Sequence, residues 1–182
     1  LVGDTIYFDA RDGNDGHELW AHDTSNHSTW QVADINSGSS DSDPGYKMEI
    51  LVGDTIYFDA NDGSTGRELW AHDTSNHSTW LVADINSGSS DSSPGNYMDA
   101  ILVGHTIYFD AYDGNSSHEM WAHDTSNSST WQVADINSGS RGSSPGLYLG
   151  PIIIGDTIYF AAVGGDQGRE LWAMKIEHSI YY

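Results

Sequence analysis

The chain repeats itself with a period of about 50 residues, which lies in the range of kelch-like propeller blades. Residues 1–10 recur at 51–60 without a change, and again at 102–111 with His105 in place of one aspartate. A looser copy covers residues 154–162. Each period must therefore build the same structural unit. A β-solenoid needs shorter rungs, and a β-sandwich does not repeat its sequence this closely.

Each period is predicted to form four short strands. In the first period we expect them over residues 5–10, 18–22, 29–35 and 46–52, where β-branched and aromatic residues alternate with others. Turn-forming Gly, Asn, Asp, Ser and Pro separate the four segments. No window has a sustained helical period. The predicted fold is all-β, a β-propeller built from tandem four-stranded blades of about 50 residues.

The repeats are predicted to make one domain over residues 1–182, with periods at about 1–50, 51–101 and 102–153 and a partial one at 154–182. Leu1 and Val2 match the end of a fourth strand, so the chain is expected to open inside a blade. Two partial blades would then flank two nearly complete ones. Because open edge strands invite pairing, we expect a longer parent chain or an assembly rather than an isolated closed monomer.

Apolar residues occupy both faces of the predicted strands. Ile6, Phe8 and Ala10 face one way and Thr5 and Tyr7 the other, and in the second strand Leu19 and Ala21 oppose Trp20. Blades covered on both sides need this pattern. Two tryptophans recur in each full period, and they are interpreted most simply as packing between blades. The pairs are Trp20 and Trp30, Trp70 and Trp80, and Trp121 and Trp131.

The segment from Gly16 to Thr24, which reads GHELWAHDT, resembles the ELWxxDGT repeat of large secreted prokaryotic proteins. The copies at 66–74 and 117–125 are similar to it, and so are the flanking IYFDA and VADI segments. The chain departs from that pattern where Asp-Gly-Thr becomes Asp23-Thr24-Ser25, and where the last copy loses its aspartate. The resemblance implies a propeller-like fold and a secreted or cell-surface setting. It implies no activity.

Composition limits the partners. The formal net charge is -21, with 27 acidic residues against six Lys and Arg, so nucleic acid and anionic lipid are poor partners. The absence of cysteine excludes disulfides and thiol chemistry. The longest apolar run, near residues 151–154, is too short to span a bilayer. The sequence begins with Leu1 rather than Met and shows no signal peptide, so we expect the true N-terminus upstream.

Acidic turns are the candidate cation sites. The segment starting at Asp34 opens as Asp-x-Asn-x-Gly, the opening of a calcium loop, although its twelfth position is Gly45 rather than glutamate. The alternative is that these residues form Asx turns that complete tight loops. In the third period Arg141 and Gly142 replace the acidic pair, which weakens the site there. The candidate calcium ligands are Asp9, Asp12, Asp34, Asn36, Asp41, Asp59, Asp62, Asp84, Asn86 and Asp91.

Four Asn-x-Ser sequons are candidate glycosylation sites, and three of them occupy equivalent predicted hairpin tips. Their acceptors are Asn26, Asn76, Asn127 and Asn115. The alternative is that asparagine simply suits the turn. Repeated histidines such as His22 are interpreted as hydrogen-bonding residues at strand ends, with metal binding as the less favoured alternative.

Three classes of function compete. The leading prediction is a non-catalytic extracellular module with a structural, adhesive or self-assembly role, because close repetition supplies surface rather than one active centre. Its partners would be other copies, neighbouring surface proteins or glycans. The alternative is a propeller with a glycan or calcium site in each blade, which exposure of Trp30, Trp80 and Trp131 would favour. An enzyme with a site in a central channel is the least favoured, because no unique catalytic set of residues is found.

Overall fold

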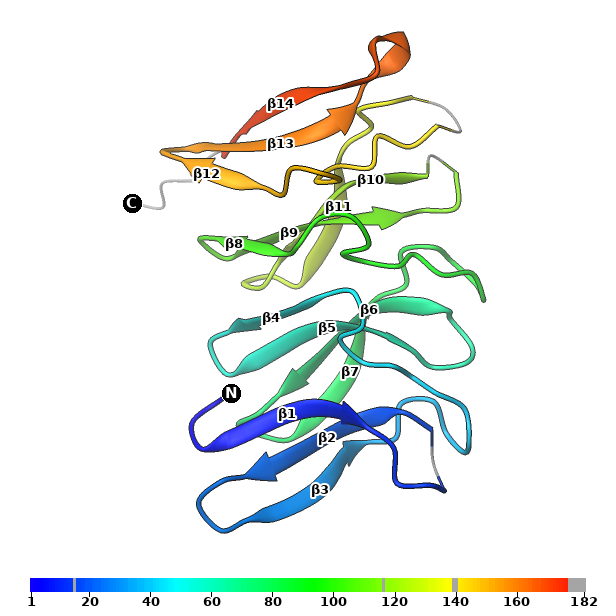
Figure 1. Cartoon of the computed structure of the whole chain (residues 1–182), viewed down its shortest axis with the longest axis vertical. Helices are drawn as coiled ribbons and strands as arrows, with labels where there is room; N and C mark the ends of the chain where they lie inside the picture. The colour runs from blue at the N-terminus through cyan, green and yellow to red at the C-terminus, as the bar shows by residue number, and fades with distance from the viewer. Residues whose placement is uncertain (15, 116, 139–140, 177–182) are drawn as a thin grey trace. The chain divides into compact units, whose positions relative to one another are not determined.

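The computed structural model describes residues 1–14, 16–115, 117–138 and 141–176 (Figure 1). These residues form four antiparallel sheets, here called sheets 1 to 4 in chain order. The chain divides into two compact units, Leu1–Pro94 with sheets 1 and 2, and Gly95–Tyr182 with sheets 3 and 4. The all-β prediction and the tandem repetition of similar antiparallel sheets are confirmed.

The strands of the first unit follow one another in chain order within each sheet. Sheet 1 consists of β1 (Thr5–Ala10), β2 (Glu18–Asp23) and β3 (Ser28–Ala33). Sheet 2 has one more edge strand, paired to the equivalent of β1, and consists of β4 (Glu49–Val52), β5 (Thr55–Asn61), β6 (Arg67–Asp73) and β7 (Ser78–Ala83). In sheet 1 the place of that edge strand is marked by a single bridge between Val2 and Thr5.

The second unit repeats this plan. Sheet 3 consists of β8 (Ile101–Val103), β9 (Thr106–Tyr112), β10 (His118–Asp124) and β11 (Ser129–Ala134). Sheet 4 consists of β12 (Ile152–Ile154), β13 (Thr157–Val163) and β14 (Arg169–Lys175), with the short 3₁₀ helix η1 (Gly165–Gln167) between the last two. Across the described residues the strand counts per sheet are therefore three, four, four and three.

The predicted fourth strand, residues 46–52, proves shorter and joins the following sheet. It begins at Glu49 as β4 and pairs with β5. The amides of Lys47 and Met48 donate instead to the Asp59 carboxylate, at 2.8 and 2.9 Å, so they leave the strand ladder. The third strand likewise ends at Ala33 rather than at residue 35. The sequence pattern could not show these limits because the partner side chains lie far away in the chain.

The strand register gives every sheet two faces that differ in composition, as the alternation of residue types along the strands predicted. In sheet 1 the pairs Phe8↔Trp20 and Trp20↔Gln31 lie on one face, called the Phe face. The pairs Tyr7↔Ala21 and Ala21↔Trp30 lie on the opposite face, called the Tyr face. The same two faces recur in sheets 2 and 3. They recur also on β13 and β14 of sheet 4, which has no equivalent of β3 among the described residues.

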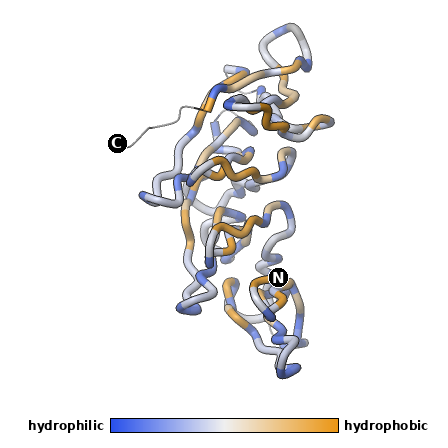
Figure 2. The backbone as a smooth tube through the Cα atoms, turned by 90° about the vertical axis from the view of Figure 1, so that its left-hand side faces the viewer, coloured by the Kyte–Doolittle hydropathy of each residue, from blue (hydrophilic) through white to orange (hydrophobic). Residues whose placement is uncertain are grey.

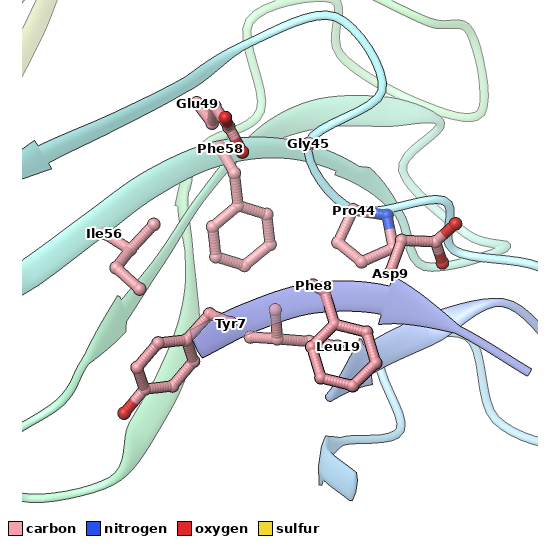
Figure 3. Close-up of a pocket in the computed structure, with 9 residues that line it drawn as sticks. All are labelled: Tyr7, Phe8, Asp9, Leu19, Pro44, Gly45, Glu49, Ile56 and Phe58. Carbon is pink, nitrogen blue, oxygen red and sulfur yellow. The ribbon is translucent and has the colours of Figure 1, made fainter. Parts of the chain in front are cut away.

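Within each unit the Tyr face of one sheet packs on the Phe face of the next. In the first unit Leu19 forms a buried cluster with Phe58 and Ala60, and Tyr7 and Trp70 pack against that cluster. Figure 3 shows Ile56 and Phe58 extending from β5 toward Leu19, whereas Phe8 points to the other side of β1.

The core of the second unit follows the same rule. Met120, on the Tyr face of sheet 3, is buried with Ile158, Phe160 and Ala162 of the Phe face of sheet 4. Figure 2 shows hydrophobic residues gathered along extended stretches of the backbone, with hydrophilic residues at many of its bends. Burial of these apolar side chains between sheets is the main source of stability for such a repeat.

A buried glutamate fixes the long loop that follows the outer strand of each of the first three sheets. Glu18, Glu68 and Glu119 are all 0 % exposed. The carboxylate of Glu68 accepts hydrogen bonds from the amides of Ile85 and Ser92, at 2.7 and 2.9 Å, and from the Ser92 hydroxyl at 2.6 Å. These contacts satisfy backbone groups that would otherwise be buried without partners.

Candidate binding groove

Two rungs of side chains recur on the Tyr face of the first three sheets. The aromatic rung is a tyrosine, an alanine and a tryptophan on three adjacent strands: Tyr7, Ala21 and Trp30; Tyr57, Ala71 and Trp80; Tyr108, Ala122 and Trp131. The polar rung beside it is a threonine, an aspartate and a serine: Thr5, Asp23 and Ser28; Thr55, Asp73 and Ser78; Thr106, Asp124 and Ser129.

The aromatic rung is covered at its centre. The central alanines are fully buried, so the middle of each rung is closed to solvent and to a ligand. Strands lie about 4.8 Å apart, so the tyrosine and tryptophan backbones of one rung are separated by roughly 10 Å. In sheet 1 the two ends of the rung, Tyr7 and Trp30, are the parts that line a groove.

In the first unit the polar rung and the two aromatic residues of sheet 1 line a groove of about 620 Å³ between sheets 1 and 2. Its walls are the rungs of sheet 1 and the turns of sheet 2 at Asp54, Thr74 and His77. Val2, Gly3 and Asn26 complete the lining. The volume lies within the range of small-molecule sites in proteins. A second, mainly apolar pocket of about 50 Å³ lies between these sheets, around Leu19 and Phe58 (Figure 3).

The outer tryptophans are accessible to a ligand. Trp30, Trp80 and Trp131 are 37, 38 and 39 % exposed, since each lies on the outermost strand of its sheet. Trp70, on the Phe face, is half-buried and packs against the core of the first unit. The packing role predicted for all six tryptophans therefore holds for Trp70. For the outer three it is incomplete, because over a third of each residue is exposed.

The tyrosines of the rungs stay protonated at neutral pH. Burial raises the pKa of the Tyr7, Tyr57 and Tyr108 hydroxyls, and the nearby carboxylates of Asp73 and Asp124 raise it further for the latter two. A protonated phenol can both donate and accept a hydrogen bond. Each rung thus carries a polar hydroxyl at its tyrosine end.

The aspartates of the polar rungs belong to the β2–β3, β6–β7 and β10–β11 turns. Asp23 Oδ1 accepts hydrogen bonds from the amide and hydroxyl of Ser25, at 2.8 and 2.6 Å. These bonds hold the pKa of the Asp23 carboxyl below its usual value, as the equivalent serines do for Asp73 and Asp124. The turns are therefore negatively charged well into the acid range, and they give the groove an acidic rim.

Three of the predicted glycosylation acceptors lie in these turns. Asn26 Nδ2 donates to Asp23 Oδ2 at 2.7 Å and its Oδ1 accepts from the Ser28 amide at 2.8 Å. Asn76 and Asn127 make the equivalent contacts. These bonds explain why asparagine suits the turn, and glycosylation stays a prediction. For the fourth sequon Asn115 is described, where its amide donates to Asp113 Oδ1, but the central Ser116 lies outside the described residues.

The candidate calcium ligands are engaged in loop contacts. Asp12 and Asp62 accept hydrogen bonds from amides two residues on, which makes them Asx turns. Asp41 and Asp91 accept the amides of His17 and Arg67, from 24 residues away. Asn36 and Asn86 each donate to the carbonyl of that same aspartate at 3.0 Å.

Four further ligand candidates form ion pairs or lie at the surface. Asp9 lies 3.0 Å from His17, and the buried Asp59 lies 2.7 Å from Arg67. Asp34 and Asp84 are exposed beside the loops. Throughout the described ranges no group of three or more His, Asp and Glu side chains is placed to hold a metal ion. Calcium binding stays a prediction.

The repeated histidines have the structural role predicted for them. His22, His72 and His123 place Nδ1 2.7, 2.9 and 2.9 Å from a threonine hydroxyl on the neighbouring outer strand. Burial lowers the pKa of His72 and His123, so both are neutral at physiological pH. They link two strands of one sheet.

The sequence did not lead us to predict the buried glutamates. It also did not lead us to predict that the buried Asp59 and Asp110 would each pair with a basic side chain. His118 Nδ1 lies 2.8 Å from Asp110, whereas Arg67 holds the equivalent position beside Asp59. A usable signal existed: an acidic residue recurs at a fixed place inside strands that are otherwise apolar. Such a residue must be paired or hydrogen-bonded if it is buried.

Comparison with known proteins supports the fold but does not indicate a family or a function. No family model and no curated protein matches the chain. Among solved structures, the chain is similar to the computationally designed Ika4 protein, with 11 % identity, a TM-score of 0.53, and coverage of 97 % of this chain and 88 % of that one. It is also similar to a putative TolB from Agrobacterium tumefaciens, with 12 % identity, a TM-score of 0.54, and coverage of 95 % and 58 %.

A puromycin hydrolase mutant complexed with PGG gives a TM-score of 0.59 at 12 % identity, and the chain covers 25 % of its length. TolB is a β-propeller, so the chain has the β-propeller fold that its repeats predicted. The identities are only 11 and 12 %, and the similar structures include both a hydrolase and TolB, so the likeness indicates no function for this chain. No helix among the described residues is long and apolar enough to cross a membrane.

Proposed function

We propose that this chain is a non-catalytic extracellular propeller module that adheres to neutral glycans through its aromatic rungs. The observation that carries the proposal is the repetition of an exposed tryptophan, a buried alanine and a tyrosine on the same face of three sheets. Repeated weak sites suit adhesion, because simultaneous contacts to a polymer raise the overall avidity.

The chemistry of the groove favours sugars over other small ligands. A sugar ring presents an apolar face and a rim of hydroxyls, which suits a groove with aromatic walls and a few polar groups. Thr5, Ser28 and the Tyr7 hydroxyl are the polar groups that such a rim can meet. The net charge of -21 and the acidic turns disfavour anionic sugars, so the proposal is restricted to neutral ones.

Several features support a non-catalytic role outside the cell. The buried carboxylates hold loops and strands rather than facing the groove, and they recur from sheet to sheet. The acidity, the sequons at turns and the resemblance to the ELWxxDGT repeats of secreted proteins support the extracellular setting. Membership of that family is part of the proposal.

The test is binding of cellohexaose, maltohexaose and chitohexaose, followed by isothermal titration, on protein made in a host that does not glycosylate. We expect binding of at least one hexaose by the wild type and its loss in a Trp30→Ala, Trp80→Ala, Trp131→Ala triple variant. A matched control replaces the exposed Leu51, Leu102 and Ile153 by alanine and should bind normally. Equal binding by both variants, or binding of none of the three sugars, would contradict the proposal.

A further inference from the structure

In sheet 2 a buried aspartate joins strand β5 to the loop that precedes the sheet. Asp59 Oδ1 accepts hydrogen bonds from the amides of Lys47 and Met48, at 2.8 and 2.9 Å. Its Oδ2 lies 2.7 Å from Nη1 of Arg67. One carboxylate thus meets two backbone amides of the loop and one basic side chain.

Sheet 3 holds the equivalent carboxylate in the same way. Asp110 Oδ1 accepts the amides of Tyr97 and Met98, at 3.0 and 2.9 Å, and Oδ2 lies 2.8 Å from His118. Two loop amides and one basic side chain therefore form a repeated set of donors for a carboxylate, here called the carboxylate cradle. Donors of this kind suit a carboxylate because hydrogen bonds to an ionised acceptor are the strong ones.

Sheet 4 replaces the aspartate of the cradle by alanine. Ala161 pairs with Leu171 in the register that pairs Asp59 with Leu69, and it is 8 % exposed. The loop still meets the strand at the same place, because the Gly146 amide donates to the Ala161 carbonyl at 2.9 Å, as the equivalent amides do in sheets 2 and 3. Only the carboxylate has been removed from this junction.

The basic member of the cradle remains in sheet 4. Arg169 Nη1 donates to the Ser144 carbonyl at 2.9 Å, just as Arg67 Nη1 donates to the equivalent Asp43 carbonyl at 2.9 Å. In sheet 2 that same nitrogen also contacts the Asp59 carboxylate. Across the described residues Arg169 has no carboxylate within ion-pair distance. Its half-buried guanidinium therefore favours an anion at this position.

The loop backbone differs from its equivalents where the carboxylate is lost. Tyr148 and Leu149 hold the positions of Tyr97 and Met98, and within the described ranges neither amide has an acceptor. Tyr148 has a φ of 72°, in the left-handed region, whereas Tyr97 does not. A bulky residue adopts this conformation only at a cost in free energy. A ligand that accepts both amides would favour the conformation seen in sheets 2 and 3.

We propose that sheet 4 binds a small monocarboxylate, with formate as the simplest example, in its carboxylate cradle. Formate is the group that distinguishes aspartate from alanine. One oxygen accepts the amides of Tyr148 and Leu149, and the other pairs with Arg169. The net charge of -21 weakens the binding of any anion, but at physiological ionic strength charges beyond about 8 Å are largely screened. The same chain already holds two carboxylates in equivalent surroundings.

The experiment is a heteronuclear NMR titration of the full chain with sodium formate at constant ionic strength, to about 0.1 M because so small a ligand binds weakly. The amide signals of Tyr148 and Leu149 should shift together and saturate. Those of Tyr97 and Met98, which already donate to Asp110, should stay in place. Equal shifts with sodium chloride or with the neutral analogue formamide, or no saturable shift with formate, would overturn the proposal.

Variants locate the site. Arg169→Gln should weaken formate binding about tenfold, because it removes the charged donor. Lys175→Gln is the matched control, since this lysine lies on the same strand with a side chain that is 79 % exposed, and it should bind formate normally. Ala161→Asp supplies the carboxylate from within, so it should raise the melting temperature and abolish the response of both amides to formate. An unchanged response in Ala161→Asp or Arg169→Gln would place the ligand elsewhere and contradict the assignment.

Discussion

Replacement of the buried Glu68 by alanine should destabilise the first unit by about 3 kcal/mol. Glu68 is 0 % exposed and accepts three hydrogen bonds, two from the Ser92 amide and hydroxyl and one from the Ile85 amide. Each is worth about 1 kcal/mol net, and alanine leaves the two amides with no acceptor inside the protein. Partial hydration of the opened loop lowers the cost, and disorder of the loop before β8 raises it.

The assay is urea unfolding at pH 5, followed by tryptophan fluorescence. At this pH the carboxyl is protonated in the folded state, because burial raises the pKa of Glu68 to about 7. The Ser92 hydroxyl also lies 3.1 Å from the Arg67 carbonyl, so it can donate there and accept the carboxyl proton. Glu170→Ala is the matched control, since Glu170 holds the same strand position but is exposed. Equal, small losses for both variants would refute the role assigned to the buried glutamates.

Three further outcomes follow from the same contacts. The raised pKa of Glu68 means that the folded state binds more protons than the unfolded chain between pH 4.5 and about 7, so Glu68 should make stability fall as pH rises through this window, by on the order of 3 kcal/mol. Glu68→Gln should make the profile measured by denaturation less steep, and the part due to Glu18 and Glu119, whose pKa values burial also raises, should remain. Asp59→Ala should cost about 3–5 kcal/mol in the same assay, because it leaves the largely buried Arg67 and two amides without that carboxylate, and a loss below about 1 kcal/mol would contradict it. Trp70→Ala should cost about 3 kcal/mol or more whereas Trp80→Ala costs much less, and equal melting temperatures for the two variants would show that the outer tryptophans are core.

The repeat and the alternation in the sequence are enough to predict the fold class, the antiparallel sheets and the two faces of each strand. They succeed because side-chain direction alternates with period two, and register follows once one face must be buried. Ile6 and Phe8 share a face in the structure for that reason, and Tyr7 lies opposite them.

The strand ends and the buried polar groups could not be predicted this way. Ile35 leaves the third strand because its amide donates to Glu18, and Lys47 leaves the fourth because its amide donates to Asp59. These partners are 17 and 12 residues away, so no local pattern contains them. A carboxylate in a strand also gives no local sign of whether its loop will fold over it.

The exposure of Trp30 could not be predicted either. Its segment, Ser-Thr-Trp-Gln-Val-Ala, has the composition of a half-buried strand. Its accessibility depends on β3 being the outermost strand of its sheet, and that depends on the order in which strands pair. The candidate groove thus became visible only when strand order and register were both known.

The most direct test of the central claim is a heteronuclear NMR titration of the seven tryptophan indole N–H signals with the hexaose that binds best. The groove account predicts that the signals of Trp30, Trp80 and Trp131 shift together as ligand is added, while that of the core residue Trp70 stays in place. Shifts confined to other tryptophans, or binding that leaves all the indole signals unchanged, would contradict the account.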